Sequence, residues 1–373
     1  MTATAGVPES GTSAAGRWRR VRHRIKHPVQ TAWAGALVRG LDRRTRSVRD
    51  LDGLEPRTIV VSRTDRIGDL LVASPLLHAL HRRWPRARLV MIAGPKNRAV
   101  LEGLPFVEQG PVFRRDPLSW TRVATWLGRQ GAELSVSLGA ESMAGVWIAA
   151  CSRAPVRMVT HATKTRPAYN LILGVDDAHQ TTRYCRAAAV LGFPTDEVRP
   201  VFIVPPDAER RAAEILPALL TPSAGPLVGF QIPHRGTRHH AARAWPVDRV
   251  PALVRQLAAD GCRVVLCGTG AERREAEHVR SQIPEAVVSP PVPLAIFAAL
   301  QRRFDLFISQ FTGTLHLADG LGVPTLSFGV REQNESWAIL GPRHQFVEGP
   351  RVADISVETL VEATRSLLGR GRN

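Results

Sequence analysis

The sequence has few of the residues that build disulfide frameworks or metal sites. Its four cysteines, in 373 residues, are Cys151, Cys185, Cys262 and Cys267, and no two of them form a C-x-x-C pair. This spacing excludes a disulfide scaffold and a zinc ribbon, and it favours a reducing, cytoplasmic compartment. We therefore expect no structural disulfide, no bound metal and no cofactor.

Long hydrophobic runs are also lacking. No apolar signal segment with a small-residue cleavage site occurs near the start, and no uncharged apolar run reaches the ~18 residues that span a bilayer. The nearest candidate, residues 134–152, is interrupted by Glu141 and by several serines. We therefore expect a cytoplasmic protein, with at most a peripheral contact on the inner face of the membrane.

Lysine and tyrosine are scarce, although the chain is strongly basic. Of 50 Lys and Arg residues only three are lysines, and the formal net charge is +17. Such a charge attracts the phosphates of nucleotides, nucleic acids or anionic lipids. The eight tryptophans and two tyrosines are scattered rather than interleaved with basic residues. That distribution is not typical of a base-stacking platform, so a nucleic-acid-binding protein is the weaker alternative.

What the chain does contain is an alternation of short β-rich runs with amphipathic segments. With 373 residues and 44% hydrophobic content, it is long enough for about two domains, each with its own core. Buried strands separated by helices predict parallel sheets in doubly wound α/β units. The predicted strands cover residues 58–62, 88–93, 134–138, 227–231, 263–267, 306–309 and 325–328, and the clearest helices 70–83, 247–260 and 272–281.

A polar, proline-rich stretch at residues 204–226 divides this pattern into two comparable halves. Two doubly wound halves that face each other leave a cleft at the carboxyl ends of their strands, where ligands bind. The predicted organisation is a leader at residues 1–56, a first domain at 57–205, a second domain at 206–345, and a C-terminal helix and tail at 346–373.

The leader is basic and partly amphipathic. Residues 1–57 hold twelve Lys and Arg against five Asp and Glu, and apolar residues recur at four-residue spacing between residues 21 and 41. One interpretation is peripheral contact with an anionic membrane through residues 17–50. The other is a helix that docks on the protein's own globular part.

A polar turn follows the first predicted strand. Asp69 comes after Gly68, where the strand leads directly into a helix, and Arg63, Asp65 and Arg66 crowd the same turn. A carboxylate at this position either caps the helix start and interacts with its dipole or carries out chemistry at the edge of the sheet.

Two turns of the second half suit a nucleotide. Gly268, Gly270 and Glu272 lie between a strand and a helix, but the third glycine of a dinucleotide fingerprint is replaced by Arg273. The other turn carries Thr312, Gly313, Thr314 and His316 at a helix start, where free backbone amides can cradle a phosphate.

A basic loop precedes the sequence R-A-W-P. Arg243 begins this tetrapeptide, after a stretch with His234, Arg235, Arg238, His239 and His240. The histidines have no second ligand at a helical metal-binding spacing, so we expect the loop to bind an anion rather than a metal.

In this order the four segments resemble glycosyltransferase family 9, whose best-known members are the ADP-heptose:lipopolysaccharide heptosyltransferases. The resemblance covers residues 57–368 and includes the stretches GPKNRAVLEGLPFVE, HQTTRYCRAAAVLGFP and ISVETLVEA. The turn at Thr312 is the most specific match, because the family's typical form is close to N-D-T-G-P-x-H-L-A-A-A-L-G-x-P.

The resemblance implies a GT-B fold, with two Rossmann-like domains that hold the acceptor and the nucleotide-sugar respectively. It implies an inverting, metal-independent transfer of a heptose-like sugar from a nucleoside diphosphate, ADP-heptose, to a hydroxyl of a glycan, glycolipid or natural product. By matching position, Asp69 is the catalytic base, Glu272 binds ribose, and the donor phosphates contact Arg243, where the family has Lys, and the residues Thr312, Gly313 and His316.

Three departures from the family pattern concern the donor side. Phe311 stands where the family commonly has Asp, Thr314 where it has Pro, and His234 where it has the Gly of a P-G turn. These changes leave the donor sugar open and keep a second function class in view, a non-catalytic nucleotide-sugar-binding protein. The presence of Asp69 favours an enzyme.

Overall fold

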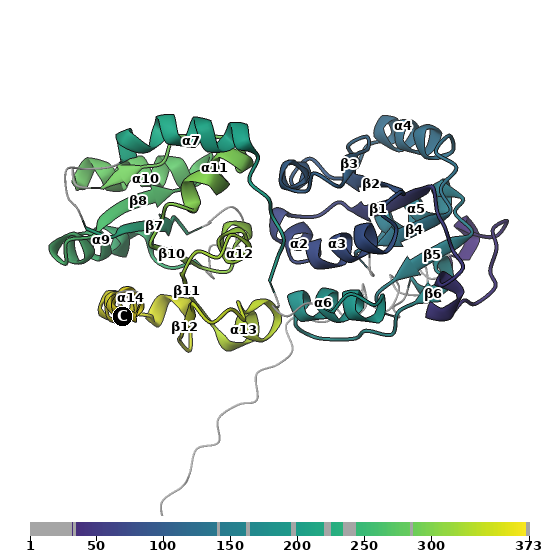
Figure 1. Ribbon diagram of the computed structural model, residues 1–373. Coiled ribbons are helices and arrows are strands. Elements are labelled where there is room, and N and C mark those ends of the chain that lie inside the picture. The colour runs from purple at the N-terminus through teal and green to yellow at the C-terminus, as the bar shows by residue number, and fades with distance from the viewer. Residues whose placement is uncertain are drawn as a thin grey trace, which may run out of the picture.

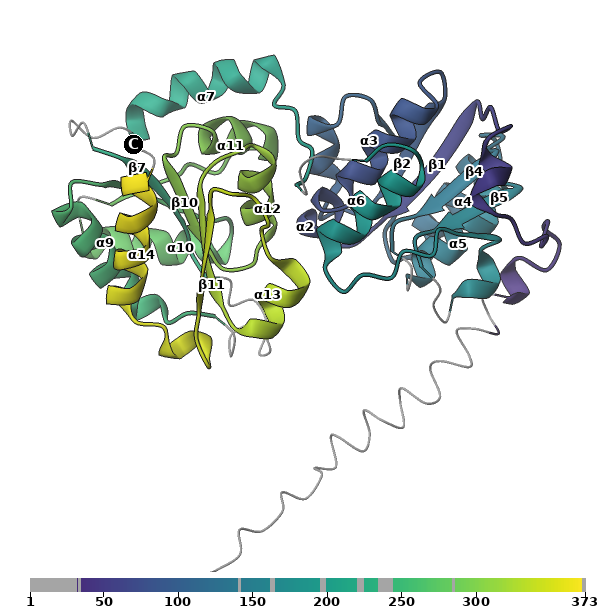
Figure 2. The same ribbon diagram turned by 60° about the horizontal axis from the view of Figure 1, so that its bottom comes forward.

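The computed structural model describes residue 32 and residues 35–139, 142–161, 165–194, 199–219, 225–233, 244–283 and 286–370. These residues form two α/β domains, each built on a six-stranded parallel sheet with helices on both faces (Figures 1 and 2). The fold class predicted from the sequence is therefore confirmed.

The first sheet has the strand order β3-β2-β1-β4-β5-β6. Its central strand is buried along its whole length, as expected for a parallel sheet that is covered on both faces. The strands are β1 (Thr58–Arg63), β2 (Arg88–Ala93), β3 (Glu108–Gln109), β4 (Leu134–Ser137), β5 (Val156–Val159) and β6 (Leu171–Ile172), and the α-helices are α2 (Ile67–Leu71), α3 (Ser74–Arg83), α4 (Pro117–Leu127), α5 (Met143–Ser152) and α6 (Gln180–Val190).

The second sheet has the order β12-β11-β10-β7-β8-β9, which repeats the winding of the first sheet. Its strands are β7 (Leu227–Gln231), β8 (Arg263–Cys267), β9 (Val287–Val288), β10 (Leu306–Ser309), β11 (Thr325–Gly329) and β12 (His344–Glu348). The α-helices are α7 (Pro206–Leu219), α9 (Val250–Ala259), α10 (Ala271–Gln282), α11 (Leu294–Gln301), α12 (Gly313–Gly320), α13 (Arg331–Trp337) and α14 (Val357–Arg370). β12 crosses residue 345 and α14 packs on this sheet, so residues 346–370 complete the second domain.

All seven strands predicted from the sequence are present. The helix predicted over residues 70–83 is split, because α2 ends at Leu71 and α3 begins at Ser74, with Pro75 in its first turn. The prediction missed β3, β6 and β9, which have two residues each, and also β5 and β12. β5 contains the buried Arg157, whose guanidinium donates to the carbonyl oxygens of Ala154 and Ala168, both at 2.9 Å. Because Arg157 interrupts the apolar residues of β5, a hydrophobicity pattern does not predict this buried strand.

Part of the segment predicted as a leader lies on the first domain. Val38 is buried in a cluster with Val146 of α5 and Tyr169, and Leu51 is buried in the main core. The carbonyl oxygen of Asp42 accepts a hydrogen bond from Arg157 at 2.5 Å. Residues 35–56 are thus docked on the domain, while residues 17–31 lie outside the described residues.

Each sheet has a switch point, where the winding reverses, between β1 and β4 and between β7 and β10. Ligands of doubly wound sheets bind beside such points, at the carboxyl ends of the strands. α2 begins just after β1 ends, and α12 just after β10 ends. Both views show α2 and α12 facing each other where the two domains meet (Figures 1 and 2).

Candidate functional site

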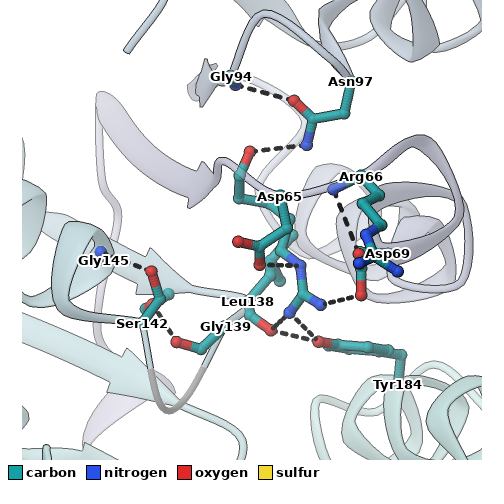
Figure 3. A network of polar contacts seen from close by, with 12 residues as sticks. Asp65, Arg66, Asp69, Gly94, Asn97, Leu138, Gly139, Ser142, Gly145 and Tyr184 are labelled. Atoms are coloured by element: carbon teal, nitrogen blue, oxygen red, sulfur yellow. Dashed lines mark hydrogen bonds and ion pairs between the residues drawn. The ribbon is translucent and has the colours of Figure 1, made fainter. Parts of the chain in front are cut away.

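At the first switch point, Asp69 is held by a buried arginine. Arg63, the last residue of β1, donates from Nη2 to Oδ1 of Asp69 at 2.8 Å. Its Nη1 donates to the carbonyl oxygen of Leu138 at 2.5 Å and to the hydroxyl of Tyr184 at 3.0 Å. The backbone N–H of Arg66 donates to Oδ2 of Asp69 at 3.2 Å. The guanidinium therefore connects the ends of β1 and β4 to the carboxylate, as the polar contacts in Figure 3 show.

The charge of Arg63 is balanced by its surroundings. Burial by itself would lower the pKa of Arg63, but Tyr184, when it is ionised, and the carboxylates of Asp69 and Asp65 outweigh it and raise that pKa above its usual value. Oδ2 of Asp65 lies 3.4 Å from Nε of Arg63. One guanidinium thus serves two carboxylates at the edge of the first sheet.

At the second switch point, hydroxyl and amide side chains form a continuous chain. The hydroxyl of Thr312 lies 2.9 Å from those of Ser309 and Thr314, and Thr314 donates to Oε1 of Gln231 at 3.0 Å. Nε2 of Gln231 donates to the carbonyl oxygen of Cys267 at 3.1 Å. Gln231, at the end of β7, therefore joins the turn before α12 to the end of β8, where the Gly268 turn begins.

The Gly268 turn requires both of its glycines. Gly270 has a φ of 56°, which disfavours other residues, and a Cβ on Gly268 would lie only 2.6 Å from Cβ of Glu272. The tight turn puts Glu272, which is half-buried, in the first turn of α10. The structure thus confirms the predicted strand-turn-helix around Glu272.

His316 lies one turn into α12 and is buried. Burial, aided by the nearby His179, lowers the pKa of His316 to about 4, so the imidazole is neutral near pH 7. Its Nδ1 has no hydrogen-bond partner among the described residues. A buried polar atom without a partner is costly.

Phe311, which precedes the turn, packs on a second aromatic ring. Its ring centroid lies 5.6 Å from that of Phe346 on β12. A Cβ on Gly329, at the end of β11, would lie 2.8 Å from Oε1 of Gln333 and 3.5 Å from the Phe311 ring, so Gly329 packs beside both side chains. At the position where the family pattern has an Asp, this chain therefore has a partly exposed aromatic side chain, Phe311.

The two switch points meet at a pair of glycines. A Cβ on Gly68 would lie 3.3 Å from Cα of Gly313 and 3.5 Å from Cδ2 of His316. The backbones of α2 and α12 thus come into direct contact, which brings Asp69 and the turn from Thr312 to His316 together from the two domains. The Gly268 turn connects to the same place through Gln231.

Arg243 and the basic loop from His234 to His240 lie outside the described residues. Just beyond them, Trp245 is fully buried, and its backbone N–H donates to Oε1 of Gln310 at 3.0 Å. The chain that follows Arg243 is therefore anchored beside the turn before α12.

The sequence reasoning missed two residues of the site and undervalued a third. Tyr184 and Gln231 gave no local signal, because each acts on groups tens of residues away in the chain. Arg63 was noted only as part of a crowded polar turn. Within the described part of the chain, no group of three His, Cys, Asp or Glu side chains could hold a metal ion, and no helix is long and apolar enough to cross a membrane.

One family model and a number of solved structures match the chain. The model of glycosyltransferase family 9 (heptosyltransferase) matches residues 138–356. Among solved structures, a family 9 glycosyltransferase from Veillonella parvula superposes with a TM-score of 0.72 at 18% identity, covering 84% of this chain and 97% of that one. The ADP-heptose lipopolysaccharide heptosyltransferase II of E. coli gives 0.69 at 16% identity, covering 85% and 100%.

A third similar structure is the E. coli heptosyltransferase WaaC with ADP-2-deoxy-2-fluoro heptose, with a TM-score of 0.64 at 15% identity, covering 83% of this chain and 99% of that one. None of the curated proteins matches the chain. At these identities the solved structures establish the two-domain GT-B fold.

Proposed function

Given that the chain belongs to glycosyltransferase family 9 and is a glycosyltransferase, we propose that it transfers a heptose-like sugar from ADP-heptose to an acceptor hydroxyl, with inversion and without a metal ion. The observation that carries the proposal is the contact between Gly68 and Gly313. It puts a carboxylate that can accept a proton beside a helix start that can bind a diphosphate.

In the proposed reaction, Asp69 accepts the proton of the acceptor hydroxyl. The oxygen attacks the anomeric carbon, and the bond from that carbon to the diphosphate oxygen breaks on the opposite face. The nucleoside diphosphate leaves with the electron pair of that bond, and the configuration at the anomeric carbon inverts.

The leaving diphosphate gains negative charge, which the second domain is equipped to stabilise. Backbone amides at the start of a helix such as α12 can donate to an anion, and the helix dipole favours negative charge there. His316, neutral and with an unpartnered Nδ1, can donate one hydrogen bond, and we assign a phosphate contact to Arg243. These groups can perform the role that a divalent cation has in other transferases, which is the basis for proposing a metal-independent reaction.

We assign the nucleoside to the Gly268, Gly270 and Glu272 turn, where a half-buried carboxylate can accept hydrogen bonds from ribose hydroxyls. ADP is the preferred nucleotide in the proposal, because the similar WaaC structures contain ADP and an ADP-heptose analogue. The acceptor is proposed to be a glycan, a glycolipid or a hydroxylated natural product, held by the first domain.

A donor screen followed by product analysis tests this function. ADP-heptose, ADP-glucose, UDP-glucose and GDP-mannose are compared by thermal shift, since a ligand that binds only the folded state raises the melting temperature. We expect ADP-heptose to stabilise most, ADP to be released on addition of an acceptor, and NMR of the product to show the inverted anomer. A retained anomer contradicts the mechanism, and a loss of rate in EDTA that Mg²⁺ restores contradicts metal independence.

The same screen separates the second candidate, a non-catalytic nucleotide-sugar-binding protein, which the aromatic residue Phe311 favours. That protein would be stabilised by a nucleotide-sugar yet release no ADP with any acceptor. Binding without turnover therefore rejects the enzyme mechanism and retains the nucleotide site.

We further propose a cytoplasmic protein with peripheral contact to the inner face of the membrane through residues 17–50. Because residues 35–50 pack on the first domain, lipid contact in this proposal falls mainly to residues 17–34, which are rich in arginine. Binding of this kind depends on anionic lipid and weakens with salt.

A further inference from the structure

Arg63 is surrounded by groups that fix its guanidinium in one orientation. The side chain is 9% exposed, and one of its nitrogens contacts both the Leu138 carbonyl at the end of β4 and the Tyr184 hydroxyl on α6. The Tyr184 hydroxyl also donates to the Leu138 carbonyl oxygen. The backbone of Arg63 is fixed as well, since Nδ2 of Asn97 donates to its carbonyl oxygen at 3.0 Å.

The nitrogen that remains on the outer side of this arrangement, Nη2, donates to Asp69. We propose that Arg63, locked by Tyr184, is a positioning residue that fixes the Asp69 carboxylate in the orientation in which it accepts the acceptor's proton. This inference rests on the proposed function, in which Asp69 is the base.

The geometry shows how the positioning works. Oδ1 of Asp69 accepts from Arg63 and Oδ2 accepts from the backbone of Arg66, so both oxygens are tethered and the side chain has one orientation. Each oxygen keeps a free lone pair for the acceptor hydroxyl. A carboxylate so held does not have to be ordered when the substrate binds.

An arginine suits this position better than a lysine. One nitrogen of its planar guanidinium donates to the Asp69 carboxylate, and another donates to the oxygens of Leu138 and Tyr184. The ammonium of a lysine has a single nitrogen and cannot span both sets of acceptors in this way. Burial raises the pKa of Tyr184, so its hydroxyl stays protonated, donates to Leu138 and accepts from Arg63. Tyr184 lies in the stretch HQTTRYCRAAAVLGFP, one of those that resemble the family.

The test measures ADP release from ADP-heptose under single-turnover conditions, with enzyme in excess and water or an acceptor present. We expect Arg63→Met to slow release about 100-fold, Arg63→Lys about 10-fold and Tyr184→Phe about 5-fold, each with the half-saturating ADP-heptose concentration within threefold of wild type. If Arg63 and Tyr184 had only a structural role, their substitution would not lower the ADP-release rate while leaving the half-saturating ADP-heptose concentration unchanged.

A double-mutant cycle with Asp69→Asn provides the decisive readout. If Arg63 acts through Asp69, then Arg63→Met costs less than about twofold once Asp69 is already Asn. Independent, multiplicative losses overturn the inference, and so does a folded Arg63→Met protein with a rate within twofold of wild type. If instead Asp69→Asn has the wild-type rate, the proposed base fails, whatever the Arg63 variants do.

Matched controls separate positioning from stability. Arg157→Lys alters another buried arginine of the same sheet, which donates to the carbonyls of Ala154, Ala168 and Asp42. Tyr169→Phe alters the chain's other tyrosine, buried in the same domain. Both should lower the melting temperature or leave it unchanged, with the ADP-release rate within twofold of wild type. If Arg63→Met does not fold, Arg63→Lys and Tyr184→Phe carry the test, and wild-type rates in both reject the inference.

Discussion

At the scale of single residues, the central ambiguity is Asp69. It accepts the backbone N–H of Arg66 in the first turn of α2, as a helix-start carboxylate does, and it follows Gly68, which contacts the start of α12 in the other domain. The two roles are compatible, because one oxygen can stabilise the helix while the carboxylate still reaches a substrate.

Asp69→Asn separates the two roles. The substitution keeps the size and much of the hydrogen bonding, so we expect donor affinity within a few-fold of wild type and transfer slower by roughly 100-fold or more, as for a lost general base. If Asp69 only interacts with the helix dipole, the substitution lowers the free energy of unfolding by about 1 kcal/mol or less and leaves turnover unchanged. Melting temperature, donor affinity and single-turnover rate on this one variant distinguish the outcomes.

A second prediction at this scale concerns Arg243. Its proposed role is positive charge on a diphosphate, so Arg243→Ala should weaken donor binding and slow transfer about 10-fold or more, while Arg243→Lys should retain most activity. Titration with ADP and steady-state kinetics check both variants. Equal activity in wild type, Ala and Lys proteins would remove Arg243 from the site.

At the scale of elements, function depends on the contact between α2 and α12. Both helices start immediately after a central strand of their sheets, and only their glycines let the two backbones touch. This arrangement gives the site one half from each domain.

Gly313→Ala tests that contact. A Cβ at Gly313 would lie 2.9 Å from the backbone nitrogen of Gly68 and 2.9 Å from Cγ2 of Ile67, so the domains must separate slightly. We expect a loss of about 10-fold or more in transfer rate with each domain still folded. Gly128→Ala is the control, because a Cβ there meets only ordinary contacts at 3.5 Å or more. Equal rates in both variants would show that close approach at Gly68 is dispensable.

At the scale of the whole molecule, the N-terminal segment contributes to the stability of the fold, and buried histidines make that stability depend on pH. Residues 35–56 contribute Val38 and Leu51 to buried clusters and the Asp42 carbonyl to Arg157. We therefore expect a truncation that removes them to lower the stability of the fold.

Two truncations check this. Removing residues 1–34 should leave the melting temperature and ADP release unchanged but reduce binding to phosphatidylserine-containing vesicles in a flotation assay. Removing residues 1–50 should also lower the melting temperature, since Val38 and the acceptor of Arg157 are lost. Undiminished vesicle binding by the shorter truncation would reject membrane contact through this segment.

The pH dependence of stability follows from His316 and His344. Burial lowers the pKa of each to about 4, below the value of roughly 6.5 in an unfolded chain. Between pH 4 and pH 6.5 the unfolded chain binds more protons than the folded protein. The contribution of these histidines to the free energy of unfolding is therefore fully present above pH 6.5 and is lost as the pH drops toward 4. Urea unfolding at pH 7 and pH 5 should show a smaller difference for His344→Gln than for wild type. The same difference in both proteins would assign the loss to other groups.

The sequence by itself determined the α/β class, the seven predicted strands and the two turns at Asp69 and Thr312. Strands buried on both faces are nearly continuous apolar runs, and a glycine turn that leads into a helix is a local feature, so both are legible in a few consecutive residues. The departure at Phe311 was visible for the same reason.

Only the tertiary structure decided which of these residues act together. Leu138 lies 75 positions from Arg63 in the chain and Tyr184 lies 121 positions from it. Gln231 accepts a hydrogen bond from Thr314, which is 83 positions away. The docking of residues 35–56 likewise includes a hydrogen bond from Arg157 to the Asp42 carbonyl oxygen, 115 positions away. These interactions depend on strand order and on the meeting of two domains, and a local pattern contains no information about either.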